Sequence, residues 1–332
     1  MIQRRPRAWA ALLIIVGCGC AKTGPQLDWS QLRQAGPHAV SVADPVVVHD
    51  AAQKRDISLR VTYPVSAGPF PVIVFSHGAF CYPQLYAEIT DHWVSHGYIV
   101  ILPNHLDSAN NGELSTGALQ SLISSRVRDM SFVLDALDQI EGEVSDIRGK
   151  TDRERMAVAG HSFGGMIAMI KFGLIVEHAE DDIQVDYSDD RFDVAVVLSG
   201  VGPAAMLDGT VLAESAFSRL TGPLFASGGT KDEGNVGTGD AFPWQWRMSG
   251  YTLAPSGDKY YLVLEDADHY LGGLICRENR SGEADPEAVE IVRTTTTAFL
   301  NAYLQDDKAA RFALRDTDFT TLTSGRAQLN YK

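Results

Sequence analysis

Residues 156–170, with the sequence MAVAGHSFGGMIAMI, decide the fold. A run of small and apolar residues, 156–159, leads into the pattern Gly-x-Ser-x-Gly at 160–164, and an apolar stretch with helical spacing follows at 166–170. Strand, sharp turn and helix in this order place the serine on an exposed, strained turn at the edge of a parallel sheet. The segment therefore predicts a buried strand, a helix and a nucleophilic Ser162 between them. The alternative is a glycine-rich turn whose serine only caps the helix.

Apolar runs of the same kind recur along the chain and alternate with amphipathic stretches. The predicted strands are 45–48, 57–63, 72–75, 99–102, 156–159, 194–198, 224–226 and 260–264, and the predicted helices are 84–94, 121–137, 163–175 and 286–304. Strands that are apolar throughout are buried on both faces, as in parallel sheets. The sequence thus predicts an α/β fold with a mostly parallel, doubly wound sheet and helices on both faces.

Composition excludes several classes of protein. The chain has 332 residues, of which 45% are hydrophobic, so it can build a full core. Its net charge of −14 repels phosphate backbones, and we expect no nucleic-acid partner. Four cysteines without a C-x-x-C pair predict no zinc site, and the acidic stretch 177–190 lacks the spacing of a calcium loop and is expected to be a solvated surface loop. We expect no metal and no cofactor.

The first residues have the layout of an export signal. Arg4, Arg5 and Arg7 precede the uncharged, mostly apolar stretch 8–16, which is too short to span a bilayer. Residues 15–18, IVGC, resemble a bacterial lipobox, whose cysteine is acylated. We therefore expect a signal peptide at 1–17, a lipidated Cys18 with a tether at 18–44, and an exported lipoprotein anchored to a membrane of the bacterial cell envelope. The alternative is an ordinary signal peptide cleaved near Ala21.

The rest of the chain predicts one domain. No internal repeat and no linker interrupts residues 45–305. Residues 306–332 are polar, and we expect an irregular tail that packs on the surface or frays.

A serine nucleophile needs a histidine base and a carboxylate that orients the base, in the chain order Ser, acid, His for this class of sheet. The strand 224–226 leads into a loop with Asp232, and the strand 260–264 leads into a loop with His269. Because the carboxyl ends of parallel strands meet at one edge, Ser162, Asp232 and His269 are predicted to come together there.

Other acids and histidines compete for these roles. Glu233, Asp266 and Asp268 are alternative acids. Asp266 and Asp268 are too near His269 in sequence to approach its ring easily as the orienting partner. His105 is the rival base, whereas His77 and His161 lie inside loop motifs and are expected to brace them.

An oxyanion hole requires two backbone N–H groups. One is expected from Phe163, the residue after the nucleophile. The other is expected from Ala79, in the loop that follows the strand 72–75, where Gly78 permits the necessary bend.

Aromatic residues and cysteines accompany these loops. Candidate substrate-binding residues are Phe80, Tyr82, Trp244, Trp246 and Tyr270. Alternatively, these rings only pack the loops down. Cys81 and Cys276 are both predicted at the active-site edge, and a disulfide between them is possible in an exported protein if their Cα atoms are close enough.

Taken together, these motifs resemble α/β-hydrolases of the platelet-activating-factor acetylhydrolase type and their bacterial dienelactone-hydrolase-like relatives. The resemblance runs through VFSHG at 74–78, SHGYIV at 95–100, GHSFGG at 160–165, YLVL at 261–264 and ADH at 267–269, and it covers residues 45–305. It implies an α/β-hydrolase fold without a cofactor, with Ser162, Asp232 and His269 as the triad and with Ala79 and Phe163 as the oxyanion donors. It also implies a small ester or lipid substrate, such as an acetylated or oxidised phospholipid.

Two departures from these relatives concern the pocket. Cys81 and Pro83 stand in a loop that is glycine-rich in many relatives, and no Trp follows the strand 194–198 as in polyester-cleaving ones. The expected function is a serine esterase of short-chain acyl esters. The alternatives are a binding module without turnover, or a polyesterase, lactonase, thioesterase or peptidase with the same machinery.

Overall fold

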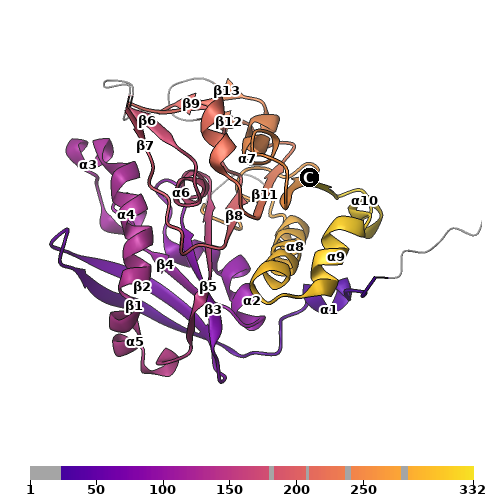
Figure 1. The fold of residues 1–332 in the computed structure, drawn as a ribbon, viewed down its shortest axis with the longest axis horizontal. Helices are drawn as coiled ribbons and strands as arrows, with labels where there is room; N and C mark the ends of the chain where they lie inside the picture. The colour runs from indigo at the N-terminus through magenta and orange to yellow at the C-terminus, as the bar shows by residue number, and fades with distance from the viewer. Residues whose placement is uncertain (1–23, 179–182, 207–208, 236–240, 278–282) are drawn as a thin grey trace, which may run out of the picture.

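A nine-stranded sheet forms the centre of the molecule, in a computed structural model that describes residues 24–178, 183–206, 209–235, 241–277 and 283–332 (Figure 1). The strand order is β1-β2-β4-β3-β5-β8-β11-β14-β15. The strands are β1 (Val40–Asp50), β2 (Arg55–Pro64), β3 (Phe70–Ser76), β4 (Ile99–Pro103), β5 (Thr151–His161), β8 (Val194–Leu198), β11 (Leu224–Gly229), β14 (Lys259–Leu264) and β15 (Ala327–Tyr331). From β4 to β14 neighbouring strands are parallel, and the pairs β1–β2, β2–β4 and β14–β15 are antiparallel. The predicted mostly parallel sheet is confirmed.

Helices cover both faces of this sheet (Figure 1). One layer contains α1 (Trp29–Arg33), α2 (Ala87–Ser95), α8 (Pro286–Leu304), α9 (Lys308–Asp316) and α10 (Phe319–Leu322). The other contains α4 (Leu122–Asp135), α5 (Leu137–Glu143), α6 (Phe163–Lys171) and α7 (Ser249–Thr252), and α3 (Thr116–Gln120) precedes α4. Successive residues of β3 pack alternately into the two layers, Val72 and Val74 into one and Ile73 and Phe75 into the other. This alternation is why the strand is apolar at every position.

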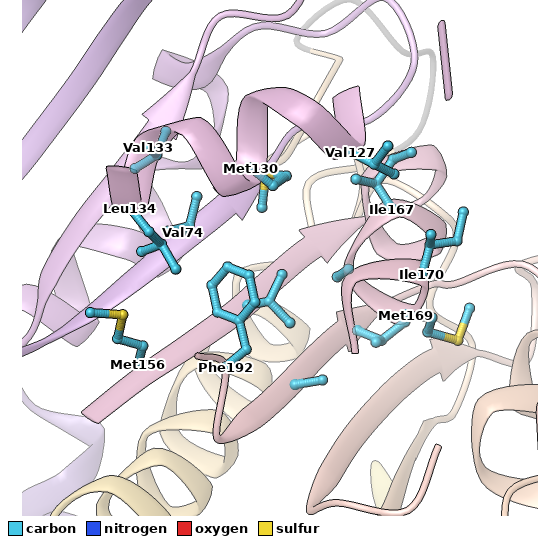
Figure 2. Close-up of a cluster of buried hydrophobic side chains, with 14 of the residues drawn as sticks. Val74, Val127, Met130, Val133, Leu134, Met156, Ile167, Met169, Ile170 and Phe192 are labelled. Atoms are coloured by element: carbon cyan, nitrogen blue, oxygen red, sulfur yellow. The ribbon is translucent and has the colours of Figure 1, made fainter. Parts of the chain in front are cut away.

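Figure 2 shows the core between α4, α6 and the sheet. Val127, Met130 and Val133 lie on one side of α4 at helical spacing and are at most 2% exposed. They pack in the same cluster as Ile167 of α6 and Val74 of β3. The hydrophobic spacing of the sequence therefore fixes which side of α4 faces the sheet.

The order of the strands brings the two predicted motif loops together. From β3 the chain continues to β4 on one side and then returns to β5 on the other side of β3. The loops that follow β3 and β5 consequently leave the same edge of the sheet side by side, with Ser76 paired to Gly160. Such a switch point in an open α/β sheet is where ligands bind.

Shorter elements complete the fold. A four-stranded sheet contains β7 (Ile183–Val185), β6 (Val176–His178), β10 (Thr210–Leu212) and β9 (Ala204–Ala205), and β12 (Gly234–Asn235) pairs with β13 (Ala241–Phe242). The 3-10 helices are η1 (Pro83–Tyr86), η2 (Ala109–Asn111), η3 (Ser145–Ile147), η4 (Glu214–Arg219) and η5 (Trp244–Met248). The acidic stretch 177–190 is expected to be a loop, but residues 177–178 belong to β6 and residues 183–185 to β7, and these two strands pair with each other.

Two predicted helices end earlier than expected. The helix predicted at 121–137 divides at Ala136 into α4 and α5. The helix predicted at 163–175 ends at Lys171, because Gly173 follows with a φ of 118°.

The expectation of an irregular tail at 306–332 is wrong. Asp307 caps α9 by accepting hydrogen bonds from the N–H groups of Ala309 and Ala310, and Ala310 and Leu314 pack into the core. Residues 327–331 then form β15, which extends the sheet beside β14. Polar composition concealed an amphipathic helix and an edge strand.

The part of the predicted tether that lies in the described residues is also ordered. Asp28 caps α1, Leu32 is buried, and the ring of Trp29 packs edge-on against Phe319 at 5.2 Å between centroids. β1 then begins at Val40. The predicted signal peptide and Cys18 lie outside the described residues. Among the helices that are described, none combines the length and apolarity that a bilayer span requires.

Candidate active site

Ser162 occupies the turn between β5 and α6. Its backbone has a φ of 57° and a ψ of −120°, a strained conformation for a residue with a side chain. The chain passes its neighbours so closely that a Cβ on Gly160 would lie 2.2 Å from the Gly164 carbonyl oxygen. A Cβ on Gly164 would lie 2.0 Å from the Ser76 carbonyl oxygen. The turn therefore requires both glycines of the motif, and it leaves Ser162 partly exposed at the sheet edge.

The structure brings the three predicted triad residues together. Ser162 Oγ lies 2.8 Å from His269 Nε2, and His269 Nδ1 lies 2.8 Å from Asp232 Oδ1. His269 is 14% exposed, whereas Asp232 is fully buried. Asp232 follows β11 and His269 follows β14, as predicted, so neighbouring parallel strands deliver both side chains to the same edge. The arrangement can move a proton from the serine to a histidine that a carboxylate orients.

The competing acids lie elsewhere. Asp266 forms an exposed ion pair with Lys231 at 2.8 Å. Asp268 accepts hydrogen bonds from the backbone N–H groups of Tyr270 and Gly272, and so braces the loop that carries His269. Glu233 uses its backbone oxygen to accept from Arg247. These roles leave the carboxylate of Asp232 beside the imidazole.

Arg247 of η5 is a site residue that the sequence interpretation missed. Its Nε donates to Asp232 Oδ1 at 3.0 Å, and its other nitrogens donate to the carbonyl oxygens of Ser199, Gly200 and Glu233. The guanidinium is buried and lies over the ring of Trp246. Nothing in the local sequence links Arg247 to Asp232, because the contact arises only where η5 packs on β11.

The charges around Asp232 keep it ionised. Burial alone would raise the pKa of this carboxyl, but the His269 imidazole and the Arg247 guanidinium outweigh burial and lower the pKa to about 2. A carboxylate of this kind remains charged over the physiological pH range. It can therefore stabilise an imidazolium on His269 without accepting a proton.

His161 connects three loops of the site. Its Nε2 lies 2.9 Å from the carbonyl oxygen of His269, and its Nδ1 lies 3.0 Å from the hydroxyl of Tyr86. Because a carbonyl only accepts, Nε2 carries the proton and Nδ1 accepts from Tyr86, whose oxygen in turn accepts from Gly78 N–H at 2.8 Å. Burial and the neighbouring His269 hold the pKa of His161 well below its ordinary value. As expected, this histidine braces loops.

The backbone groups predicted for the oxyanion hole flank the turn. Phe163 is the first residue of α6, so its N–H has no acceptor within the helix. Ala79 follows Gly78 in the loop after β3. A Cβ on Gly78 would lie 3.0 to 3.1 Å from Cys276, His161 and Tyr86, so a side chain would displace this loop.

A disulfide joins the two loops that contain Cys81 and Cys276, with Cα atoms 5.2 Å apart. It links the loop after β3 to the loop that carries His269. Phe80 is 51% exposed, and the ring of Tyr270 packs edge-on against His269. Tyr82 and Trp244 are partly buried.

Trp246 differs from the predicted substrate contact. It is buried, it stacks on Phe242 with 4.6 Å between ring centroids, and its Nε1 donates to the carbonyl oxygen of Pro203. This ring packs loops together beneath Arg247.

A second chain of Ser, His and Asp lies beneath the loop after β3. His105, the rival base, bonds to Ser76 Oγ at 2.9 Å through Nε2 and to Asp129 Oδ2 at 2.8 Å through Nδ1. All of these side chains are fully buried. No substrate can reach this serine, so His105 is excluded as the base for Ser162.

Among the described ranges, no group of three or more His, Cys, Asp or Glu side chains is arranged to hold a metal ion.

Comparison with known proteins identifies relatives over part of the chain. The family model described as chlorophyllase matches residues 30–203, which include Ala79 and Ser162 but not Asp232 or His269. Platelet-activating factor acetylhydrolase of Canis lupus familiaris is 27% identical over 194 residues, 47% of this chain and 39% of the relative. Chlorophyllase-1 of Arabidopsis thaliana is 25% identical over 177 residues, 48% of this chain and 54% of the relative. Each match thus spans less than two thirds of the relative's length.

Proposed function

The chain belongs to the chlorophyllase family of α/β-hydrolases, and from this premise we propose that it is a serine hydrolase of carboxylic esters. The observation that carries the proposal is the unbroken hydrogen-bond chain from a partly exposed Ser162 through His269 to Asp232. A strained turn presents this serine at the switch point of the sheet. The names of the relatives support ester chemistry, since both kinds of relative are ester hydrolases.

In the proposed mechanism, Ser162 Oγ attacks the ester carbonyl carbon while its proton passes to His269 Nε2. Asp232, held by Arg247, orients the ring and stabilises the imidazolium. The N–H groups of Ala79 and Phe163 stabilise the tetrahedral oxyanion. Collapse releases the alcohol, which takes the proton from His269. Water then attacks the acyl-enzyme in the same way, and the carboxylic acid leaves.

We propose short-chain acyl esters, such as acetylated or oxidised phospholipids, as the substrate class. A platelet-activating factor acetylhydrolase among the relatives supports this choice. The exposed Phe80 and the ring of Tyr270 beside His269 would flank an acyl chain. The mechanism requires no cofactor.

The test is hydrolysis of p-nitrophenyl esters of graded acyl length, an sn-2-acetyl phospholipid and a chlorophyll ester by the purified protein and by Ser162→Ala. We expect turnover that falls with acyl length and disappears in the variant. Preference for the chlorophyll ester would replace the proposed substrate class.

A binding module without turnover is the alternative from another class of function. A fluorophosphonate probe distinguishes it, because the probe labels only an activated serine. Absence of both turnover and labelling at Ser162 would refute the proposed hydrolase.

We also propose that Cys18 anchors the protein as an exported bacterial lipoprotein. Its position in the lipobox-like stretch 15–18 supports this. Membrane fractionation should change with Cys18→Ala or with globomycin, and unchanged fractionation would indicate an ordinary signal peptide.

A further inference from the structure

Arg126 of α4 is a charged residue buried directly beneath the loop that follows β3. Its side chain is 0% exposed, and its Nε and Nη2 bond to the two oxygens of Asp107 at 2.9 and 2.6 Å. A buried guanidinium is costly unless all its donors are used. Here, among the remaining donors, Nη1 donates to Ser76 Oγ at 3.2 Å, and both Nη1 and Nη2 also donate to the loop; the proposed mechanism gives these bonds no role.

These remaining donors hold backbone carbonyls of the loop. Arg126 Nη1 donates to the carbonyl oxygen of His77, and Nη2 donates to that of Gly78 at 3.2 Å. The same Gly78 oxygen accepts from His77 Nδ1 at 2.8 Å. Two donors from the protein interior therefore fix the direction of the Gly78 carbonyl.

The direction of this carbonyl determines that of an oxyanion donor. The Gly78 C=O and the Ala79 N–H belong to one planar peptide unit, which is trans, so the two groups point in opposite directions. With the carbonyl held inward by Arg126, the Ala79 N–H points away from the buried guanidinium. Rotating this N–H out of place would require breaking these two hydrogen bonds and the one that the Gly78 oxygen accepts from the Cys81 N–H at 3.2 Å.

The pair of Arg126 and Asp107 also contacts the Ala79–Phe80 peptide and the residue of the second oxyanion donor, Phe163. Asp107 Oδ2, which accepts from Arg126, also accepts from Phe80 N–H at 3.2 Å. The Arg126 guanidinium lies 4.7 Å from the ring centroid of Phe163, the residue after the nucleophile. Arg126 thus contacts both segments that supply oxyanion donors, and none of its hydrogen bonds reaches the triad.

We propose that Arg126 is a positioning residue for the oxyanion hole, which orients the Ala79 N–H through the Gly78 carbonyl and the Phe163 segment through its ring. This inference rests on the proposed ester hydrolysis and adds a determinant to it. Because an oxyanion forms only on the way to the tetrahedral intermediate, the residue should act on kcat and not on KM.

The first test is Arg126→Lys. A lysine keeps the positive charge, but one ammonium cannot reach the carboxylate and both carbonyls that the planar guanidinium holds. We expect kcat for a p-nitrophenyl ester to fall by roughly 10²-fold, the scale for a lost oxyanion donor, with little change in KM. Affinity for a trifluoromethyl ketone, whose adduct carries an oxyanion, should fall in parallel, whereas affinity for the matching methyl ketone should not.

Asp107→Asn and Asp129→Asn form a matched pair in the same buried cluster. Both carboxylates face an arginine, Arg126 and Arg55 respectively, but only Asp107 also binds the loop. We expect Asp107→Asn to lower kcat by about tenfold, part of the value of one oxyanion donor, and Asp129→Asn to leave kcat near that of the wild type. This pair carries the test if Arg126→Lys does not fold, because an amide keeps the shape of the carboxylate.

Folded Arg126→Lys or Asp107→Asn with wild-type kcat would overturn the role of Arg126, and so would an equal loss in Asp129→Asn, which would indicate general destabilisation. The pH dependence of kcat/KM should be the same in all active variants, because the triad is untouched. A wild-type protein that neither hydrolyses esters nor reacts with fluorophosphonate would refute the proposed function itself. An active wild type with unaffected variants would refute only this inference.

Discussion

Two hydrogen-bond chains of Ser, His and Asp lie close together in this molecule. In one, Ser162, His269 and Asp232 are joined at 2.8 and 2.8 Å; in the other, Ser76, His105 and Asp129 are joined at 2.9 and 2.8 Å. Both serines stand at the carboxyl end of neighbouring parallel strands, since Ser76 pairs with Gly160. Residue types, distances and position on the sheet therefore do not separate the two chains.

Backbone and access separate them. Ser76 is the last residue of a regular strand and is fully buried, whereas Ser162 stands on a strained turn at the start of α6 and is partly exposed. Burial, and then the positive charge of Arg126, hold the pKa of His105 well below its ordinary value. A serine becomes a candidate nucleophile through the turn that exposes it and the helix N-terminus beside it, and hydrogen-bond geometry alone is insufficient.

The serines should differ most. Ser162→Ala should lower kcat by roughly 10⁶-fold, as removal of a nucleophile does in serine proteases. Ser76→Ala should instead lower the free energy of unfolding by about 1 to 3 kcal/mol, because it leaves a buried His105 nitrogen without its partner. Steady-state kinetics and urea unfolding of both variants measure the contrast. Comparable loss of activity in the two would mean that the buried chain takes part in turnover.

The aspartates should differ by less. Asp232→Asn should lower kcat by about 10⁴-fold, because an amide does not hold His269 in the tautomer that accepts the serine proton. The Asp129 carboxylate bonds to His105 and Arg55, and the kcat of Asp129→Asn should stay near that of the wild type. Kinetics on the same ester series provide the measurement. A small loss in Asp232→Asn would reassign the acid to another carboxylate.

Acid should affect activity before it affects the buried cluster. Below neutral pH, kcat/KM should fall with a single-proton slope as His269 is protonated, because Asp232, with a pKa of about 2, stays ionised. Arg126 outweighs burial and lowers the pKa of Asp107, so the stability from Asp107 is full above the unfolded carboxyl pKa and is lost below about pH 4. Thermal unfolding of the wild type and of Asp107→Asn at and below about pH 4 tests this loss of stability. Equal acid sensitivity of the two proteins would remove Asp107 as its source.

The smallest effect on turnover is expected from the disulfide that joins the loop after β3 to the loop with His269. Cys81→Ser/Cys276→Ser separates two loops that are 195 residues apart in sequence, and we expect a loss of about 3 to 5 kcal/mol in stability. The hydrogen bonds of His161 to His269 and Tyr86 remain to hold these loops, so kcat should fall only a few-fold. Melting curves and kinetics with and without reductant would show this. A total loss of activity would make the disulfide essential to the site.

Local patterns in the sequence predicted the parts of the molecule that local physics determines. The central strands, the turn at Ser162, and the loops with Asp232 and His269 each follow from a short apolar run and the residues directly after it. Arg247 and Asp107 were missed because their partners are remote in sequence. Arg126 left a trace, since it stands four residues before Met130 and seven before Val133 on the buried side of α4. A charge on an apolar helix face predicts a buried partner.

The ends of the described chain were harder to predict. β15 is a short edge strand of mixed polarity, and its pairing with β14 supplies the order that its composition does not. α1 is only five residues long, and tertiary packing of Leu32 and Trp29 stabilises it. Such elements are stabilised by packing against the folded core, and a short stretch of sequence does not indicate that packing.

The bulge in β1 has a consequence for behaviour at high concentration. β1 is a long, open border of the sheet, and Val40, Val42 and Val47 are all exposed on it. Its register with β2 shifts between Ala43 and Val46, and Pro45 within that interval has no N–H to offer. A strand from another molecule would find the backbone N–H donors of β1 interrupted at Pro45. This interruption hinders edge-to-edge pairing of sheets between molecules. Pro45→Val would supply the missing N–H at this border, and we expect more aggregation at high protein concentration, measured by light scattering.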